Sequence, residues 1–387
     1  MGSEVTFYCF FLLFCLFLGV NSFQNNIRPL DPSSLNRLRP LLHSDFKFGF
    51  IGDIQYADHD NAFNFQKTHL RRYRQSLRIF KDAIKSWNQN QIKFSIVLGD
   101  QLDNLAQAKN MKTKCLNDFK SVSSTSEHVL HYSYGNHDYY CQSREDIMKH
   151  FGMIKEENAH YHTSIGGNQD PSRLFYDFSP HEGWRFINLD SYEISLIGAV
   201  DNDMKVKAEK ILADNNPNDM NGSGGWFDNL PRDKYRYVPY NGGVSPSQLQ
   251  WLDTVLKKSK ERNEKCVIFC HNPIISPNKP QSLFWNAEEV LTIIRRHSNV
   301  VLWLAGHDHG GEYVLDEESQ MHMLVPPAPL ECDDGEQAFG HISVNQKEGV
   351  MNVEWTGRLP RKSYMKWPKQ LKISSTDAAY NVDALCE

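Results

Sequence analysis

Asp, Asn, Gln and His side chains stand at five places in this sequence where a run of apolar residues ends. The positions are Asp53 with Gln55, Asp100, Asn136 with His137, His271, and His307 with His309. Carboxylate and amide oxygens together with imidazole nitrogens suit Mn²⁺, Mg²⁺, iron or Zn²⁺, and the set contains no thiolate. We therefore expect a metal centre built from oxygen and nitrogen ligands.

Each of these positions has an ordinary structural explanation when it is taken alone. A Gly-Asp pair such as Gly52-Asp53 is usually a turn, and a single histidine in a loop, such as His271, is usually a hydrogen-bonded loop residue. All five positions, however, directly follow predicted strands. Ligands of open α/β sheets bind beyond the carboxyl ends of the strands, so the joint occurrence favours one shared site.

The elements that carry these residues alternate between strand and helix. The preceding apolar runs predict strands over residues 46–51, 94–98, 129–134, 265–270 and 300–304. Apolar residues three and four apart over residues 70–87 predict an amphipathic surface helix, and Ser245 with Pro246 and Gln248 forms a typical helix start. This alternation predicts a sheet with crossover helices.

We expect one catalytic domain over residues 46–361, because no Ser/Gly/Pro-rich linker divides the 387-residue chain. Residues 191–243 are polar, rich in Asn and Gly and without a regular period, which indicates a long functional insertion near the site. Residues 23–45 are assigned to an N-terminal extension and residues 362–387 to a C-terminal tail.

The first 22 residues differ from the rest of the chain. Residues 7–20 are almost entirely apolar, which is typical of a signal-peptide core and short of the roughly 20 residues that span a bilayer. Cleavage after Ser22 would send the chain into the secretory pathway. No Lys or Arg precedes the run, so an uncleaved anchor or a mis-assigned start remains an alternative, and the location is cytosolic if the segment is not a functional signal.

The formal net charge of −5 and the lack of a Lys/Arg cluster argue against a nucleic-acid or anionic-membrane partner. We expect a small-molecule partner, no stable membrane association after signal cleavage, and a monomer. Cys266 and Cys270 lie in one predicted strand, about 13 Å apart, which excludes a mutual disulfide. Asn221 begins a glycosylation sequon in a Gly-rich stretch.

The motifs Gly-Asp-x-Gln, Gly-Asp-Gln-Leu-Asp, Gly-Asn-His-Asp, His-x-Pro and Gly-His-Asp-His occur here in an order that resembles the calcineurin-like metallophosphoesterases over residues 46–361. A closer resemblance is to the manganese-dependent ADP-ribose/CDP-alcohol diphosphatases. It rests on residues 52–58, 64–66, 72–76, 240–243 and 303–311. The resemblance implies an α/β fold, a four-layer sandwich of two mixed β-sheets flanked by α-helices.

The resemblance also implies two divalent metal ions, with Mn²⁺ preferred and Mg²⁺ or other divalent ions accepted. The ligands of one ion would be Asp53, Gln55 and His309, and those of the other Asn136, His271 and His307. Asp100 would bridge the two ions. Two cations about 3.5–4 Å apart polarise phosphoryl oxygens and generate hydroxide from bridging water.

His137 would be the catalytic acid or electrophile that meets the phosphate, oriented by Asp138, with Asp103 as further support. Gln55 stands where many members of the superfamily have His. An amide oxygen hardens the metal site and favours Mn²⁺. A weak or water-mediated ligand is the alternative for Gln55.

The resemblance points to Phe65 and to the turn with Tyr240 and Asn241 as candidate substrate contacts. Leu283 and Phe284 follow His271 in a Pro-containing loop and are expected to line the same pocket. Phe65 would stack on a nucleobase, although an ordinary core aromatic is an equal alternative. The neighbouring arginines Arg71, Arg72 and Arg74 are expected on a solvated helix face.

Three functions follow from these expectations. The first is hydrolysis of the diphosphate bond of ADP-ribose, CDP-choline, CDP-glycerol and related nucleoside diphosphate derivatives. The second is a secreted enzyme with the same machinery that acts on another phosphodiester or phosphomonoester. The third is a non-catalytic metal or nucleotide binder, which predicts a damaged ligand set, whereas every ligand position here carries a competent residue.

Overall fold

Two six-stranded β-sheets pack face to face in the computed structural model, which describes residues 45–64, 66–151, 173–222 and 224–373. The first sheet has the order β16-β15-β14-β1-β4-β5. Its strands are β1 (Phe46–Ile51), β4 (Phe94–Leu98), β5 (Val129–Ser133), β14 (Ala338–Asn345), β15 (Val350–Gly357) and β16 (Gln370–Lys372). Because β1, β4 and β5 are parallel, their carboxyl ends share one edge.

The second sheet has the order β12-β13-β11-β10-β7-β6. Its strands are β6 (Tyr176–His181), β7 (Trp184–Asn188), β10 (Lys265–Phe269), β11 (Val300–Leu304), β12 (Glu312–Leu315) and β13 (His322–Val325). The four inner strands are parallel, and β6 and β12 are antiparallel edges. The ends of β10 and β11 therefore also share an edge.

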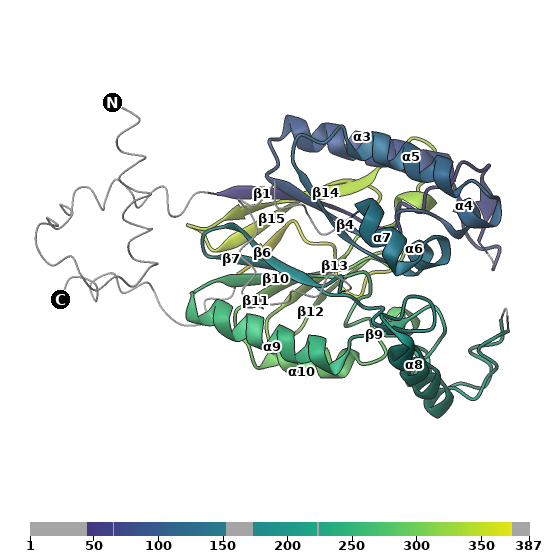
Figure 1. Ribbon diagram of the computed structural model, residues 1–387. Helices are drawn as coiled ribbons and strands as arrows, with labels where there is room; N and C mark the ends of the chain where they lie inside the picture. Colours follow the sequence, from purple (N-terminus) through teal and green to yellow (C-terminus); the bar gives the residue numbers. More distant parts are fainter. Residues whose placement is uncertain (1–44, 65, 152–172, 223, 374–387) are drawn as a thin grey trace, which may run out of the picture. The chain divides into compact units, whose positions relative to one another are not determined.

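Helices cover the outer face of each sheet (Figure 1). Helices α3 (Tyr73–Gln89) and α5 (Lys112–Ser123) cover the first sheet, and α9 (Pro246–Glu261) and α10 (Ala287–Arg295) cover the second. Helix α9 begins as expected, because the Ser245 hydroxyl accepts a hydrogen bond from the Gln248 amide at 3.1 Å. The predicted four-layer α/β sandwich is confirmed.

Shorter elements connect these layers. They are β2 (Ala62–Phe63), β3 (Leu70–Arg71), α4 (Asn104–Ala108), α6 (Asn136–Cys141), α7 (Arg144–Phe151), β8 (Ile194–Ser195), α8 (Asn202–Asn215), β9 (Gly242–Gly243) and the 3₁₀ turns η2 (Arg232–Lys234), η3 (Pro280–Ser282) and η4 (Pro329–Glu331). Among them, α4, α6, α8 and β9 lie at the end of the sandwich where the parallel strands finish (Figure 1).

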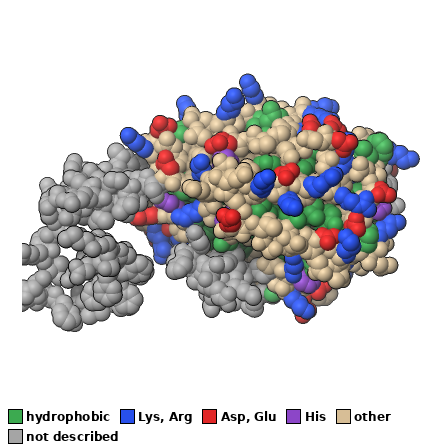
Figure 2. Space-filling model, turned by 90° about the horizontal axis from the view of Figure 1, so that it is seen from above, with side chains coloured by type: hydrophobic (Ala, Val, Ile, Leu, Met, Phe, Trp, Pro, Cys, Tyr) green, Lys and Arg blue, Asp and Glu red, His purple; other side chains and the backbone are tan. Residues whose placement is uncertain are grey.

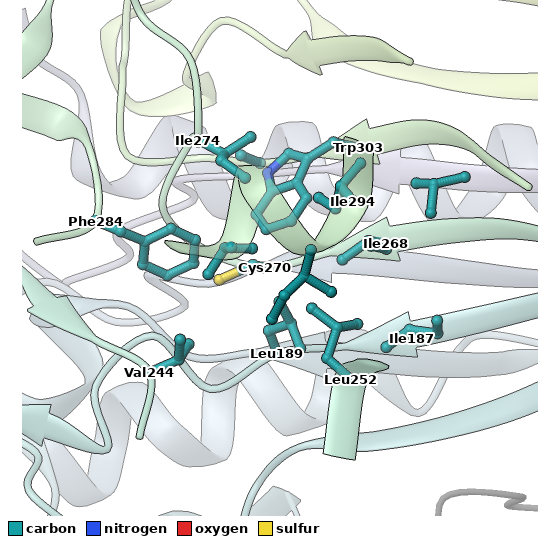
Figure 3. Close-up of a cluster of buried hydrophobic side chains, with 14 of the residues drawn as sticks. Ile187, Leu189, Val244, Leu252, Ile268, Cys270, Ile274, Phe284, Ile294 and Trp303 are labelled. Carbon is teal, nitrogen blue, oxygen red and sulfur yellow. The ribbon is translucent and has the colours of Figure 1, made fainter. Parts of the chain in front are cut away.

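Apolar layers between the sheets and beneath the helices hold the sandwich together. Between the sheets, the Phe186 ring lies 5.1 Å from Phe48 and 4.9 Å from Phe94, so aromatic side chains of both sheets interdigitate. Beneath α9 and α10, Leu252 and Ile294 pack on Trp303 and its neighbours (Figure 3). Each such buried side chain contributes about 1.5–3 kcal/mol of transfer free energy.

The structure corrects several expected boundaries. Helix α3 begins at Tyr73, and residues 70–71 form β3 instead, because the Arg72 amide donates to the Leu330 carbonyl at 2.8 Å and ties the chain down before the helix. The expected irregular insertion, residues 191–243, contains α8, which Asp201 caps by accepting from the Met204 amide. Residues 362–373 are not only a tail, since β16 pairs with β15.

Several expectations fall on residues outside the described ranges: the signal peptide over residues 1–22, most of the N-terminal extension, Phe65 and the end of the tail. Within the described residues, Cys266, Cys270 and the other cysteines are buried thiols, and Asn221 is exposed. No helix in that part of the chain has the length and apolar character needed to cross a membrane.

Candidate metal centre

Several residues at the converging strand ends have unusual backbone φ angles. Asp53, Gln55, Asp100 and His307 have positive φ angles of 52°, 43°, 55° and 69°. Such angles are uncommon for residues other than glycine. Backbone strain of this kind clusters where a fold must aim functional side chains.

Glycines next to these residues let the side chains approach the backbone closely. A Cβ on Gly135 would lie 2.1 Å from Asp100 Oδ1, and a Cβ on Gly99 would lie 2.4 Å from His271 Nδ1. Gly99 also has a φ of 91°. Alanine at either position would therefore displace a predicted metal ligand.

The first group of predicted ligands is Asp53, Gln55, Asp100 and His309. One ligand atom each from Asp53, Asp100 and His309 lies within 4.8 Å of the others. Gln55 Nε2 is 2.8 Å from both Asp100 Oδ2 and His309 Nε2, whereas Gln55 Oε1 is buried without a hydrogen-bond partner. A half-turn of the amide exchanges the two atoms, so Gln55 can present its oxygen to a cation in the same place.

The second group is Asn136, His271 and His307, with Asp100 shared. His271 Nε2 lies 3.1 Å from His307 Nδ1 and 3.6 Å from Asp100 Oδ2. The Tyr192 hydroxyl is 3.5 Å from Asn136 Oδ1, and the Tyr192 ring lies 6.3 Å from the His271 ring, which places Asn136 beside His271. The structure thus brings all seven predicted ligand residues into one cluster around Asp100.

A hydrogen bond on the far ring nitrogen orients each ligand histidine. His271 Nδ1 lies 2.8 Å from the Leu98 carbonyl, His309 Nδ1 lies 2.9 Å from Glu331 Oε1, and His307 Nε2 lies 2.8 Å from Asn241 Oδ1. All three partners are acceptors, so each ring donates a proton outward. The other nitrogen then turns its lone pair toward the cluster, as in metal-binding histidines.

The electrostatics of the cluster fit divalent cations. Burial and the charge of Asp100 raise the pKa of Asp53 well above its usual range. Burial, followed by the neighbouring imidazoles, lowers the pKa of His307 well below its usual value, so this ring is neutral. Buried carboxylates, an amide oxygen without a partner and neutral imidazoles make a donor set that fits two divalent ions, with Asp100 between them.

His137 is held by a different carboxylate from the one expected. His137 Nδ1 lies 3.2 Å from Asp103 Oδ2. Burial lowers the pKa of His137, but the charges of Asp100 and Asp103 outweigh burial, and the pKa lies above its usual value.

The expectation that Asp138 orients His137 is therefore wrong. The Asp138 carboxylate accepts from the backbone amides of Gly135, Asp100 and Gln101 at 2.8–2.9 Å. It braces the ends of β4 and β5 against each other.

The predicted substrate contacts lie in different surroundings, and only one of them borders the site. Tyr240 is partly exposed, with its ring 5.6 Å from the His307 ring, so it borders the site. Asn241 is fully buried behind His307, and it supports that ligand rather than contacting a substrate. Leu283 and Phe284 are packed into the apolar layer beneath α9 and α10, where Figure 3 shows Phe284, so they do not line an open pocket.

The structure also corrects the expectation of a solvated arginine face. The Arg72 side chain is 12% exposed and donates to the Cys332 carbonyl at 2.9 Å. Arg71 Nη1 lies 3.9 Å from Asp103 Oδ2. Only Arg74, which is half exposed, lies on a solvated face.

Three residues of the site were not predicted from the sequence in their present roles. They are Glu331, Tyr192 and Asn241, the last as a support for His307. Glu331 lies in η4, beyond the last metal motif, and no sequence spacing connects it to His309. Tyr192 lies in the polar insertion, where its hydroxyl also lies 3.2 Å from the Tyr240 carbonyl. A glutamate in a proline-rich segment was the only signal for Glu331 in the sequence.

The surface contributes one further observation. On the face shown in Figure 2, Lys and Arg side chains are interspersed with Asp and Glu. This face therefore carries no continuous basic stripe of the kind that binds a nucleic-acid backbone.

The chain is similar to known proteins over most of its length. The family model described as calcineurin-like phosphoesterase matches residues 46–311. A protein of Xenopus laevis named manganese-dependent ADP-ribose/CDP-alcohol diphosphatase is 35% identical, covering 79% of this chain and 87% of that protein. A protein of Arabidopsis thaliana with the same name is 34% identical, covering 77% and 91%. A dimetal phosphatase structure from Danio rerio covers 85% of this chain and 99% of its own, with a TM-score of 0.71 and 28% identity.

Proposed function

Because the chain belongs to the calcineurin-like phosphoesterase family, we propose that it is a hydrolase that cleaves the diphosphate bond of ADP-ribose, CDP-alcohols and related nucleoside diphosphate derivatives. The observation that carries the proposal is the complete cluster of seven ligand residues that includes Asp100, in which a hydrogen bond on the far ring nitrogen orients each histidine. The relatives of Xenopus laevis and Arabidopsis thaliana bear names that state this substrate class.

Two divalent ions would be held by the ligand groups described above, with Asp100 common to both. When bound, they supply charge neutralisation for the phosphate and activate water at neutral pH. The hard amide oxygen of Gln55 favours Mn²⁺ among the divalent ions. The names of the relatives agree with this preference.

His137 supplies the protein's own acid. It lies outside the ligand set, and the charges of Asp100 and Asp103 outweigh its burial and raise the pKa of its ring above its usual value. Asp103 engages Nδ1, so Nε2 faces away from this carboxylate and can donate a hydrogen bond or a proton to the leaving phosphate oxygen. The partly exposed Tyr240 ring borders the same site and offers a stacking face for a nucleoside.

A direct assay tests the proposal. The purified protein is freed of metal, reloaded with Mn²⁺, Mg²⁺ or Zn²⁺, and offered ADP-ribose, CDP-choline, a cyclic nucleotide and p-nitrophenyl phosphate. We expect the highest kcat/KM for ADP-ribose or CDP-choline with Mn²⁺, and release of a nucleoside monophosphate. Cleavage of the monoester or the cyclic nucleotide without cleavage of the diphosphates would overturn the proposal in favour of another phosphoesterase.

We propose further that the chain enters the secretory pathway and acts as a monomer. The apolar run over residues 7–20 supports the first part, and the exposure of Asn221 makes its sequon accessible to glycosylation. N-terminal sequencing of protein from a eukaryotic host tests cleavage after Ser22. A chain recovered with Met1 intact in the cytosol would contradict it, and a dimeric mass in light scattering would contradict the second part.

A further inference from the structure

Lys279 is a partly exposed cation beside the metal ligands, and the proposed chemistry gives it no role. Its ammonium forms an ion pair with the carboxylate of Asp308, the residue between His307 and His309. The Lys279 side chain is 41% exposed and that of Asp308 is 3% exposed. The carboxylate is therefore buried, while the lysine side chain that pairs with it is partly exposed.

The loop that carries Lys279 is fixed to the metal centre. The Lys279 amide donates to Ser276 Oγ at 3.2 Å, and Ser282 Oγ donates to the Lys279 carbonyl at 2.8 Å. Asn241 Nδ2 donates to the Gln281 carbonyl at 2.7 Å, while Asn241 Oδ1 accepts from His307. One buried amide thus holds both the ligand histidine and the loop.

The ammonium itself lies against the turn that follows the ligands. A Cβ on Gly310 would lie 2.9 Å from Lys279 Nζ, so glycine leaves the room that the ammonium occupies. Its partner Asp308 stands between the ligands His307 and His309 in the chain, so the ion pair places Lys279 beside the turn that carries both ligands.

We propose that Lys279 is a specificity-determining residue, whose ammonium binds the second phosphate of a nucleoside diphosphate, the one that is not attacked. This inference rests on the proposed function for its substrate class. A diphosphate places a second negative group next to the attacked phosphate, and a lysine ammonium is a strong phosphate partner. Because the ion pair with Asp308 already restricts the Lys279 side chain, phosphate binding costs less side-chain entropy than it would at an unrestrained lysine.

A plainer explanation is that Lys279 only neutralises the buried Asp308 carboxylate. Removing the lysine alone would leave that charge unpaired, which is costly and would disturb the adjacent ligands. The double variant Lys279→Met/Asp308→Asn removes both charges. In the wild type the Gly310 amide donates a hydrogen bond to Asp308 Oδ1 at 3.0 Å, and the side-chain oxygen at position 308 of the variant can still accept it. Under the plainer explanation this double variant recovers wild-type binding, whereas under the proposal it does not.

The experiment compares two probes that differ by one phosphonate. Isothermal calorimetry with protein in excess Mn²⁺ measures the Kd of α,β-methylene-ADP, which has a non-hydrolysable bridge, and the Kd of AMP. We expect the preference for α,β-methylene-ADP to fall by about tenfold or more in both Lys279→Met and the double variant, as for the loss of a charge-assisted hydrogen bond. Lys257→Met, at an exposed lysine of α9, is the matched control and should keep the preference.

Two results overturn the proposal: a double variant with the wild-type preference, or Lys279→Met with the wild-type preference. The manganese content of each variant shows whether the ligands remain intact, and the double variant serves where Lys279→Met does not fold. The outcome is separable from the proposed function. If the wild type hydrolyses no diphosphate but the preference depends on Lys279, the proposed function fails and the binding role stands.

Discussion

Asp138 is adjacent to His137 in the sequence and Asp103 is far from it, yet it is Asp103 that reaches the His137 ring in the fold. Asp103 faces the His137 ring, whereas the Asp138 carboxylate accepts hydrogen bonds from three backbone amides. The Gly-Asn-His-Asp motif alone favours the adjacent Asp138. Only the turn into α4, where Asp103 is the N-cap, brings the correct carboxylate to the ring.

His137→Ala should lower kcat by about 10²–10⁴-fold and leave the metal content unchanged, because His137 is an acid and not a ligand. Asp103→Asn should lower kcat by a smaller factor, since the ring remains but loses one of the charges that raise its pKa. Steady-state kinetics with Mn²⁺, together with metal analysis, measure both effects. If His137→Ala also lost its metal, the assignment of His137 as an acid would be wrong.

Glu331→Ala should weaken Mn²⁺ binding by about 10–100-fold, because the acceptor that aims His309 is lost. Calorimetric titration of the metal-free protein with Mn²⁺ measures this directly. Glu317→Ala, at an exposed glutamate after β12, is the control. Equal Mn²⁺ affinity in both variants would mean that Glu331 does not support the metal centre.

Secondary-structure elements were predicted well wherever a strand was buried on both faces. The strands that precede Asp53, Asp100 and His307 are mainly apolar, and their carboxyl ends give the site its position. The start of α3 was not predictable, because the Leu330 carbonyl that ties down Arg72 is about 260 residues away in the sequence. Helix α8 was missed because charged residues interrupt its apolar stripe.

The packing of α3 on β4 and β5 contains a histidine that should affect stability. His128 Nε2 lies 2.8 Å from Ser95 Oγ, and the His128 ring lies 6.1 Å from the Trp87 ring. Burial lowers the pKa of His128 from 6.5 to about 4. Between these two pH values the unfolded chain binds a proton that the folded chain does not, so stability is lost as pH falls from about 6.5 toward 4.

The contribution of His128 should be about 1–2 kcal/mol, after allowance for its partial exposure. Urea unfolding at pH 7 and at pH 4.5 measures it. His128→Gln removes the titration and keeps a polar group for Ser95, so this variant should lose less stability over the same range. An equal loss in wild type and variant would show that the carboxylates alone cause the acid sensitivity.

At the scale of the whole molecule, the metal centre joins the two sheets. Asp53, Asp100 and Asn136 follow strands of the first sheet, and His271 and His307 follow strands of the second. The sequence predicted this convergence because it depends on strand ends. It did not predict Asn241 and Glu331, which come from a turn and a 3₁₀ segment whose positions depend on the finished fold.

Because the ligands come from both sheets, Mn²⁺ should stabilise the whole sandwich and not only the site. Binding to the folded state alone adds about 2.7 kcal/mol to the free energy of unfolding when free Mn²⁺ is 100 times its Kd. Asp100→Ala removes the ligand that both groups share, so it should abolish this gain while retaining a folded, metal-free protein. Thermal unfolding with EDTA and with increasing Mn²⁺ gives the comparison. A rise in Tm with Mn²⁺ that was equally large in Asp100→Ala would place the stabilising ion elsewhere, and the sheets would then be held together by their apolar layer alone.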